Sequence, residues 1–530
     1  MGGRVIALAL ALAVCGAAAA QQDAKNWAEA NATFNKFGGS KDAAERTKAA
    51  EAIGDGRSEK YDKTAAKMII ALLGAELARD KGGVGKDEEK VSGEVLDACE
   101  TALKKITHKE AVEDLINIAR AKAQNPRLRF YVCRAIGVHK DAVKALIELV
   151  DDKILCVQIG AIDGLILAKD PSSLDVLLKV VSATDRTWEC KIGAVQAIEK
   201  IADKSDKVVD SLIDALGKCK VDEGRIKVEI MRVLGDFLGI KDAKSDDPNW
   251  WKSAKKDKES PAKDGTTIEP AEFFGLKAKS TRIVFVLDRT GSMADPCTFP
   301  DKPKDPKKDP PKPGVQTGEK PDPAQEGARQ KAEELKKKYD ERKVASKMDG
   351  LKREFINTIY NLDPRVHFTV VWYEGNHTYW KEQLVPATWQ TKLECIQDID
   401  KLNPSGGTNV WGGLEAAYKL VEQPARPDVV QVDKKGNYAT VVNGPDTFFL
   451  MTDGNHNTGK FVKDQGGRPG TDDGGFIGEL KKVHALRKVV INVVALGDLG
   501  AGADPITQNS LNFLKKIADE TGGNFAHIGK

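Results

Sequence analysis

The spacing of apolar residues divides the chain into two parts with different periods. Up to about residue 240 apolar residues recur at helical spacing, as Val143, Leu146, Ile147 and Val150 do. From residue 281 short apolar runs alternate with amphipathic segments. The runs are 282–287, 367–373, 447–451 and 489–496, and the amphipathic segments are 347–361, 388–402, 411–422, 475–487 and 508–521. We therefore predict a multidomain protein with an all-α N-terminal part and a C-terminal α/β part containing a mainly parallel, doubly wound sheet.

The helical part contains an internal repeat. Residues 108–116, His-Lys-Glu-Ala-Val-Glu-Asp-Leu-Ile, recur 31 positions later at 139–147 as His-Lys-Asp-Ala-Val-Lys-Ala-Leu-Ile. Asp141, Asp170 and Asp203 mark successive helix starts, where their side chains are expected to cap helices. The spacing resembles that of HEAT or armadillo solenoids, which present a curved surface to another macromolecule. The alternative is an ordinary helical bundle with accidental repetition.

Changes in composition suggest the domain boundaries. We expect a signal peptide at 1–20, a HEAT-like helical repeat domain at 21–240, a linker at 241–280 and the α/β domain at 281–530. The linker combines a Trp-Trp pair, Trp250 and Trp251, with a polar, Lys-rich stretch. We expect the two tryptophans to pack back onto the last repeat as a cap.

The first twenty residues have the pattern of a secretory signal peptide. Arg4 precedes an apolar run at 5–14, and alanines occupy 17–20. The run is too short to cross a bilayer of about 30 Å, and no later segment predicts a transmembrane helix. We expect cleavage after Ala20 and an exported protein, periplasmic or extracellular. Lipid attachment at Cys15, as in a lipoprotein, is the alternative.

Charge and cysteine content narrow the function classes. The chain has 82 Lys and Arg against 79 Asp and Glu, so no global field favours nucleic acid, and we expect no nucleic-acid partner. Its 8 cysteines include no Cys-x-x-Cys pair, which argues against a zinc site or a disulfide framework. Most of those within the helical part are expected to be small buried hydrophobes.

Oxygen-bearing residues lie in three loops of the α/β part. Asp288, Thr290 and Ser292 follow the first apolar run, Thr408 ends a Ser-Gly-Gly-Thr turn, and Asp453 follows the run at 447–451. Because ligands in doubly wound folds bind beyond the carboxyl ends of the strands, we expect these loops to converge. Carboxylate and hydroxyl oxygens are hard donors of the kind that Mg²⁺ prefers.

Together these motifs resemble the metal-ion-dependent adhesion site of von Willebrand factor type A (vWA) domains. The resemblance covers about residues 280–530 and implies a Rossmann-like vWA fold that binds one divalent cation, most often Mg²⁺, with Mn²⁺ or Ca²⁺ as alternatives. It further implies that Thr290 and Ser292 are direct ligands, that Thr408 binds directly or through water, and that Asp288 and Asp453 act largely through water. Thr290 departs from the usual Ser of the family but offers the same hydroxyl. The alternative is a degenerate vWA fold whose acidic turn only caps a helix.

Only two protein carboxylates would face the divalent ion, so the site would be nearly neutral and open to an Asp or Glu from a protein partner. We therefore expect a non-enzymatic, metal-dependent binding or scaffolding protein. One alternative is a purely structural repeat scaffold with a vestigial metal site. Another is a Mg²⁺-dependent hydrolase, although the sequence has no HExxH, GxSxG or P-loop motif. Near the site, Arg289 is expected to point to solvent and His456 to lie in a surface loop.

An insertion at about 295–346 separates the metal turn from the first helix of the domain. Residues 295–323 are rich in Pro and Lys, which favours an extended or disordered segment, and 324–346 are predicted to be helical. Because the insertion leaves the sheet beside Ser292, one hypothesis is that it borders the metal face and controls access to it. The alternative is a solvated loop without such a role.

Overall fold

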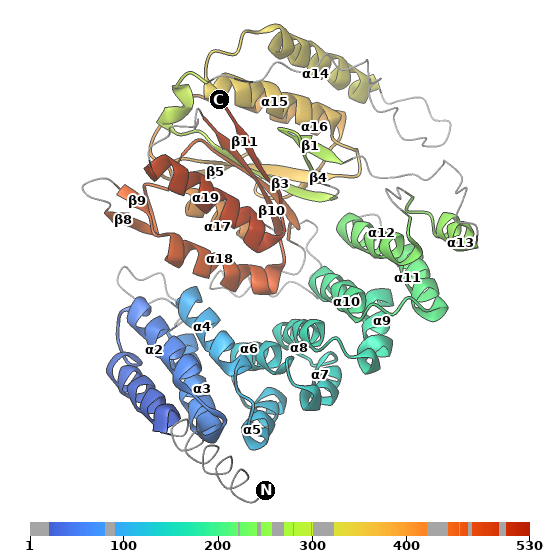
Figure 1. Ribbon diagram of the computed structural model, residues 1–530. Coiled ribbons are helices and arrows are strands. Elements are labelled where there is room, and N and C mark those ends of the chain that lie inside the picture. The colour runs from blue at the N-terminus through green and yellow to red at the C-terminus, as the bar shows by residue number, and fades with distance from the viewer. Residues whose placement is uncertain are drawn as a thin grey trace, which may run out of the picture. The chain divides into compact units, whose positions relative to one another are not determined.

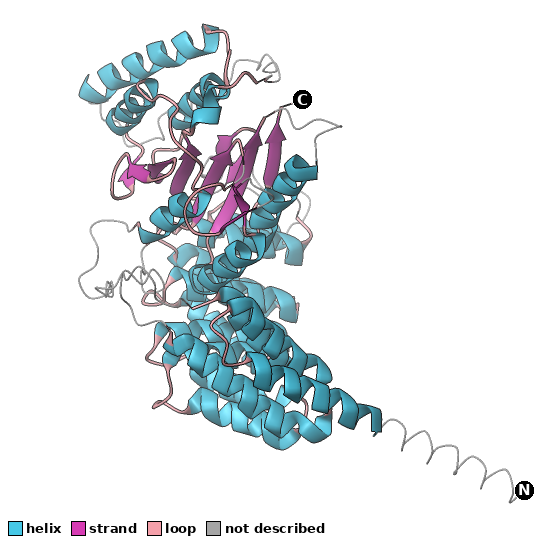
Figure 2. Ribbon diagram, turned by 90° about the vertical axis from the view of Figure 1, so that its left-hand side faces the viewer, coloured by secondary structure: helices cyan, strands magenta, loops and turns pink. Residues whose placement is uncertain are grey.

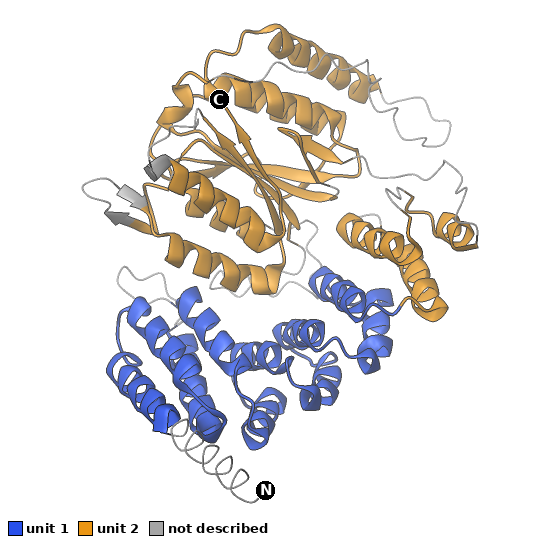
Figure 3. Cartoon of the chain, viewed as in Figure 1, with its two compact units in different colours: residues 1–203 blue, residues 204–530 orange. Residues whose placement is uncertain are grey.

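The computed structural model describes residues 21–79, 91–220, 223–240, 245–256, 270–278, 280–297, 299, 323–420, 444–454, 456–464, 469–497 and 505–529. Contacts divide the chain into two compact units, residues 1–203 (unit 1) and 204–530 (unit 2) (Figure 3). The expected signal peptide with Cys15 lies outside the described residues, as does most of the Pro-rich part of the insertion. Among the described residues, no helix has both the length and the apolar character needed to cross a membrane.

Unit 1 consists of helices (Figure 1). After a helix at 21–37 come α2 (Ala43–Gly56), α3 (Asp62–Ala78), α4 (Gly93–Lys104), α5 (Lys109–Arg120), α6 (Pro126–Ile136), α7 (Val143–Leu149), α8 (Leu155–Ala168), α9 (Leu174–Ser182) and α10 (Trp188–Ile201). Along one layer α4 packs on α6, α6 on α8 and α8 on α10, while α5, α7 and α9 pack on α6, α8 and α10 respectively. The apolar face predicted from Val143, Leu146 and Val150 is buried in this stack.

Helix starts in unit 1 follow the predicted aspartates only in part. Asp170 caps the turn η3 (Pro171–Ser173) by accepting a hydrogen bond from Ser172 N. Asp141 instead lies inside the 3₁₀ turn η2 (Lys140–Ala142). The N-cap position, from which a side chain reaches the first free amides, is occupied by His139. Asp141 lies beyond it, so the predicted cap is wrong. The later helix α11 begins at Asp206 with Ser205, not Asp203, as its N-cap residue.

Buried cysteines account for part of the apolar interior. Cys99 and Cys133 in unit 1 and Cys395 in unit 2 have almost no exposed surface. Burial raises the pKa of each thiol, that of Cys133 to about 12. These three residues therefore pack as small hydrophobes, as expected for unit 1.

Unit 2 begins with three helices and continues as an α/β domain. The helices are α11 (Asp206–Lys218), α12 (Gly224–Leu238), α13 (Pro248–Lys256), α14 (Pro323–Glu341), α15 (Lys347–Asn361), α16 (Trp389–Asp400), α17 (Val410–Lys419), α18 (Asp473–Arg487) and α19 (Pro505–Thr521). The strands are β1 (Ala271–Phe273), β2 (Leu276–Ala278), β3 (Arg282–Asp288), β4 (His367–Tyr373), β5 (His377–Tyr379), β6 (Val385–Pro386), β7 (Thr447–Thr452), β8 (Val462–Asp464), β9 (Pro469–Thr471), β10 (Val490–Leu496) and β11 (Phe525–Ile528).

The main sheet has the order β11-β10-β7-β3-β4-β5, with β6 also pairing with β4. Strands β11, β10, β7, β3 and β4 are parallel, and β5 and β6 are antiparallel to β4. The chain first builds outward from β3 to β4 and β5, then returns to the other side of β3 with β7. This reversal confirms the predicted doubly wound sheet and creates a switch point between β3 and β7. The long parallel strands were predicted, whereas the short strands β5, β6 and β11 were not.

Alternate residues of β3 supply two separate cores. Ile283, Phe285 and Leu287 belong to the core that includes residues of α15 and α16. Val284 and Val286 belong to the core formed with α17, α18 and α19. Helices therefore cover both faces of the sheet (Figure 2), which explains why the strand reads as a continuous apolar run.

The segment expected to be a linker, 241–280, contains both α13 and the β1-β2 hairpin. Helix α13 packs on α11, and Trp251 is fully buried with its indole N–H donating to Ser245 O at 2.7 Å. This confirms the packing role expected for Trp251. Contacts place the division between the units at residue 203, earlier than the composition change near 240. One reason is that Arg225 of α12 donates hydrogen bonds to Asp446 O and Lys488 O beside the sheet.

Backbone contact between α6 and α8 generates a test of the packing in unit 1. A methyl group on Gly137 would overlap the backbone oxygen and Cα of Gly164, whereas one on Gly74 of α3 would meet open space. We expect Gly137→Ala to lower the free energy of unfolding by about 1–3 kcal/mol because the helices must separate. The control Gly74→Ala should raise it by about 0.5–1 kcal/mol because it restricts the unfolded chain. Urea denaturation of the full chain followed by circular dichroism measures both, and equal effects would contradict the proposed close contact.

Candidate metal-binding site

Two predicted site residues lie at the carboxyl ends of neighbouring parallel strands. Asp288 is the last residue of β3, and Asp453 directly follows β7. In the register of these strands Leu287 lies opposite Met451, so the two carboxylates reach the same edge of the sheet. This edge is the switch point at which doubly wound folds bind their ligands.

Short contacts connect four of the five predicted residues. Thr290 N donates to Asp288 Oδ1 at 2.8 Å, and the hydroxyls of Thr290 and Ser292 are 3.1 Å apart. Ser292 Oγ donates to Asp453 Oδ1 at 3.0 Å. Thr290 is the N-cap residue of the 3₁₀ turn η4 (Gly291–Ala294), which brings Ser292 back toward the strand ends. The group formed by Asp288, Thr290, Ser292 and Asp453 is called the oxygen cluster below.

The fifth residue, Thr408, belongs to a loop that is fastened to the same turn through the backbone. Gly291 N donates to Gly406 O at 3.1 Å, and Ser405 N donates to Arg289 O at 2.8 Å. Gly406 has φ of +73°, a left-handed conformation that suits glycine. Thr408 itself is buried, and its backbone N–H donates to Asn457 Oδ1 at 2.7 Å. All three predicted loops therefore meet at one edge, and Thr408 is placed there by backbone contacts of its loop together with the side chain of Asn457.

Asp288 is buried without exposed surface and is surrounded by hydroxyl groups. Thr452 Oγ1 donates to Asp288 Oδ2 at 2.9 Å, and the Tyr373 hydroxyl lies 3.3 Å from the same oxygen. Burial and, to a smaller extent, the nearby charge of Asp453 raise the pKa of Asp288 to about 7, against the lowering effect of hydrogen bonds from Thr290 and Thr452. A cation in the cluster would offset both the lost hydration and the repulsion between the carboxylates.

The first residue of α15 supplies a positive charge to the cluster, and no local pattern in the sequence indicated this. Lys347 Nζ lies 2.9 Å from Asp453 Oδ2 and 3.7 Å from Asp295 Oδ2. The side chains of Lys347 and Asp453 are 12% and 0% exposed, so this ion pair is shielded from water. Lys347 directly follows the insertion, and only tertiary contact reveals its proximity to a residue more than a hundred positions away.

Arg289 was expected to point to solvent, but its side chain is instead paired with a carboxylate. Its guanidinium donates to Glu374 Oε1 at 3.1 Å, and its side chain is 23% exposed. Glu374 follows β4, and its second oxygen accepts a hydrogen bond from Ser405. Glu374 therefore connects the turn at 288–292 to the loop at 405–408. Its isolated position in the sequence did not indicate this role.

His456 is buried, so its assignment to a surface loop is wrong. Its Nε2 contacts Lys460 O, and its Nδ1 lies 3.5 Å from Trp411 N. Burial lowers its pKa. The ring packs against Phe476 of α18, so apolar contacts made by the loop decide its position.

The chemistry of the oxygen cluster fits a hard divalent cation. Its side chains offer two carboxylates and two hydroxyls from two strand ends, and a hydroxyl can donate its hydrogen to a carboxylate while a lone pair faces a metal. The ammonium of Lys347 already acts as a cation against Asp453. Among the described residues, no three acidic, histidine or cysteine side chains form a metal-ligand group. A metal held here would therefore draw on hydroxyl or water oxygens as well as the two carboxylates.

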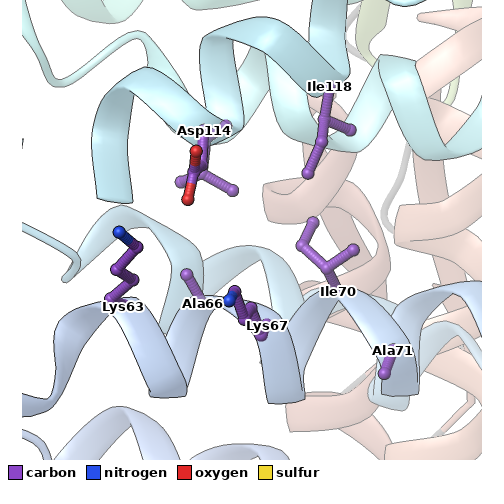
Figure 4. Close-up of a pocket in the computed structure, with 8 residues that line it drawn as sticks. Lys63, Ala66, Lys67, Ile70, Ala71, Asp114 and Ile118 are labelled. Carbon is purple, nitrogen blue, oxygen red and sulfur yellow. The ribbon is translucent and has the colours of Figure 1, made fainter. Parts of the chain in front are cut away.

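A groove elsewhere, in unit 1, has a different character. It lies between α3 and α5, has a volume of about 190 Å³ and is shown in Figure 4. Its lining consists of Lys63, Ala66, Lys67, Ile70, Ala71, Asp114, Leu115 and Ile118. Lys63 pairs with Glu110 at 2.9 Å beside this groove. Its polar lining side chains are Lys63, Lys67 and Asp114, and the rest of the lining is apolar.

No protein-family model and no curated protein matches the sequence. Among solved structures, a von Willebrand factor type A protein from Catenulispora acidiphila is 14% identical, with a TM-score of 0.24, and the match covers 48% of this chain and 40% of that protein. The PilB minor pilin from Streptococcus sanguinis gives 14% identity, 47% and 56% coverage and a TM-score of 0.23. The pilus adhesin SpaC from Lactobacillus rhamnosus GG gives 10% identity, 49% and 28% coverage and a TM-score of 0.25. The chain thus spans less than half the length of the first of these proteins.

The raised pKa of Asp288 generates a prediction for the metal-free protein. The folded carboxyl titrates near 7, whereas the ordinary pKa of an Asp side chain is 3.8, so the folded state holds an extra proton between these values. The stability contributed by this proton is complete below pH 3.8 and is lost as pH rises through 7, with a slope of at most about 1.4 kcal/mol per pH unit. Urea denaturation in EDTA between pH 5 and 8 should show this decline in the wild type and a shallower one in Asp288→Asn. Equal slopes in the two proteins would contradict the assignment.

Proposed function

We propose that the α/β part of unit 2 is a vWA domain whose oxygen cluster binds one divalent cation, preferably Mg²⁺, and that the protein is a non-enzymatic, metal-dependent binding or scaffolding protein. The observation that carries the proposal is the continuous chain of contacts from Thr290 to Ser292 to Asp453, at 3.1 and 3.0 Å. It stands at the switch point of a doubly wound sheet, where this class of fold binds ligands. Hard oxygen donors of this kind suit Mg²⁺, Mn²⁺ or Ca²⁺.

Each residue of the cluster has a separate role in this proposal. Ser292 and Thr290 would hold the cation through hydroxyl lone pairs, and Thr408 would bind it directly or through water. Asp288 and Asp453 would supply negative charge and contact the cation largely through water. Bound there, the ion would act as a Lewis acid with an open position for an Asp or Glu of a protein partner. Ser292 is exposed, so the partner can reach the cluster from its side.

Neighbouring residues of the chain orient the Asp288 carboxylate and exclude water from it. Asp288 is held by the hydroxyl of Thr452 and the backbone N–H of Thr290, which fixes the direction of both of its oxygens. Tyr373, whose hydroxyl lies 3.0 Å from Met451 O, closes the cluster on the side of the sheet. Such outer contacts commonly tune the affinity of a metal site.

The helices of unit 1 would supply a second binding surface. We propose that their layered packing forms a HEAT-like solenoid, which suits contact with a macromolecule along an extended face. From the signal-peptide pattern at 1–20 we propose that the protein is exported, to the periplasm or the extracellular space, with lipid attachment at Cys15 as the alternative. Such a protein would join two partners in an assembly, one through each unit.

Direct metal binding tests the cluster. Thr452→Val removes the hydroxyl that holds Asp288, so we expect Mn²⁺ or Mg²⁺ affinity measured by calorimetry to fall by roughly 10- to 100-fold. Thr447→Val is the matched control, because Thr447 is buried at the other end of β7 and donates to Asp446 at 2.9 Å. It should affect stability without changing metal affinity. A wild-type protein that binds neither metal would refute the proposal and leave a purely structural scaffold.

Partner capture tests the function. The immobilised protein should retain a native exported partner in Mg²⁺ and release it in EDTA, and Asp453→Ala should retain none, because the open metal position is lost. N-acetylglutamate amide, whose only carboxylate is the side chain, should compete with the partner, whereas N-acetylglutamine amide, which has no carboxylate, should not. Retention that persists in EDTA and in Asp453→Ala would assign binding to the helices instead. Metal-dependent turnover of a phosphoester or peptide would favour the hydrolase alternative.

A further inference from the structure

Lys347 is placed where a helix start disfavours a positive charge. It is the first residue of α15, after the N-cap Ser346, and the free N–H groups of a helix start carry partial positive charge. Its ammonium nevertheless lies within the oxygen cluster, at 2.9 Å from Asp453 Oδ2, with 12% of the side chain exposed. The carboxylates of Asp453 and Asp295 therefore hold it against the preference of the helix.

Both oxygens of Asp453 are occupied by donors of the chain. Oδ1 accepts the Ser292 hydroxyl at 3.0 Å, and Oδ2 accepts Lys347 at 2.9 Å. A divalent cation that draws on the same carboxylate would lie close to the ammonium, and like charges at such a distance repel strongly where water is excluded. The full charge of Asp453 is available to only one of the two cations.

We propose that Lys347 is a built-in competitor for the metal, which neutralises Asp453 in the metal-free protein and must move aside when a divalent cation binds. This inference rests on the proposed function, because it concerns the affinity of the same site. Lys347 is a positioning residue that sets the metal concentration at which the site fills.

A second carboxylate is already placed to receive the displaced ammonium. Asp295 Oδ2 lies 3.7 Å from Lys347 Nζ, and the Asp295 side chain is 63% exposed. Lys347 N also donates to Asp295 O at 3.0 Å, which joins the two ends of the insertion at this point. Transfer of the ammonium from Asp453 to Asp295 therefore requires only a side-chain rotation and leaves the backbone link intact. The metal state of the cluster would thereby be sensed at the base of the insertion.

Calorimetric titration of the full chain with Mn²⁺ alone tests the proposal. We expect Lys347→Met, which keeps the aliphatic stem without the charge, to bind Mn²⁺ at least about tenfold more tightly than the wild type. Lys347→Gln should change the affinity in the same direction and serves if the Met variant folds poorly by circular dichroism. Asp295→Asn should weaken binding severalfold, because the displaced ammonium loses its acceptor. Lys343→Met, at an exposed lysine of the same insertion, is the matched control and should leave the affinity unchanged.

The outcomes separate the two proposals. Tighter binding in both Lys347 variants supports competition. Unchanged or weaker binding in them, with a wild type that binds Mn²⁺, overturns the role of Lys347 and leaves the metal site standing. Absence of Mn²⁺ binding in the wild type and in both Lys347 variants refutes the metal site itself, and the competition with it.

Discussion

The carboxylates of Asp288 and Asp453 are brought to one edge of the sheet by the parallel pairing of β3 and β7. Neither side chain is exposed to solvent, so water cannot separate their charges. Such a pair requires compensation by hydrogen bonds, by a proton or by a cation. The structure contains each of these forms of compensation. Asp288 accepts hydrogen bonds from the Thr452 hydroxyl and the Thr290 amide, and its pKa of about 7 favours a bound proton. Asp453 is paired with the ammonium of Lys347. The arrangement of the surrounding loops follows from this need.

The insertion is built around the same point. Its ends meet where Lys347 N donates to Asp295 O, directly beside the oxygen cluster. The described helix of the insertion, α14, packs on α15 and α16 through Ala328, Ala332 and Tyr339. Residues 323–341 are therefore part of the folded domain and not a solvated loop. A change in the charge balance of the cluster would act first on Lys347, which begins α15 and closes the insertion.

The sequence predicted the long elements of unit 2 because each satisfies a strong local pattern. Strand β4 was predicted at its observed bounds, 367–373, and helix α15 at 347–361. The short strands β5 and β11 escaped prediction because three or four residues contain too few positions to establish a period. The cap expected at Asp141 failed for a related reason, since a 3₁₀ turn displaced the helix start by a few residues.

The sequence alone determined which oxygen donors follow which strands, because a buried parallel strand has a recognisable apolar run and its loop begins where the run ends. That was sufficient to place Asp288, Thr290, Ser292 and Asp453 at one edge. Tertiary structure alone decided which charges meet there, namely Lys347 with Asp453 and Glu374 with Arg289. It also decided that His456 is buried. Local patterns report the spacing of neighbours along the chain, whereas the electrostatic balance of a buried site depends on distances between residues that folding brings together.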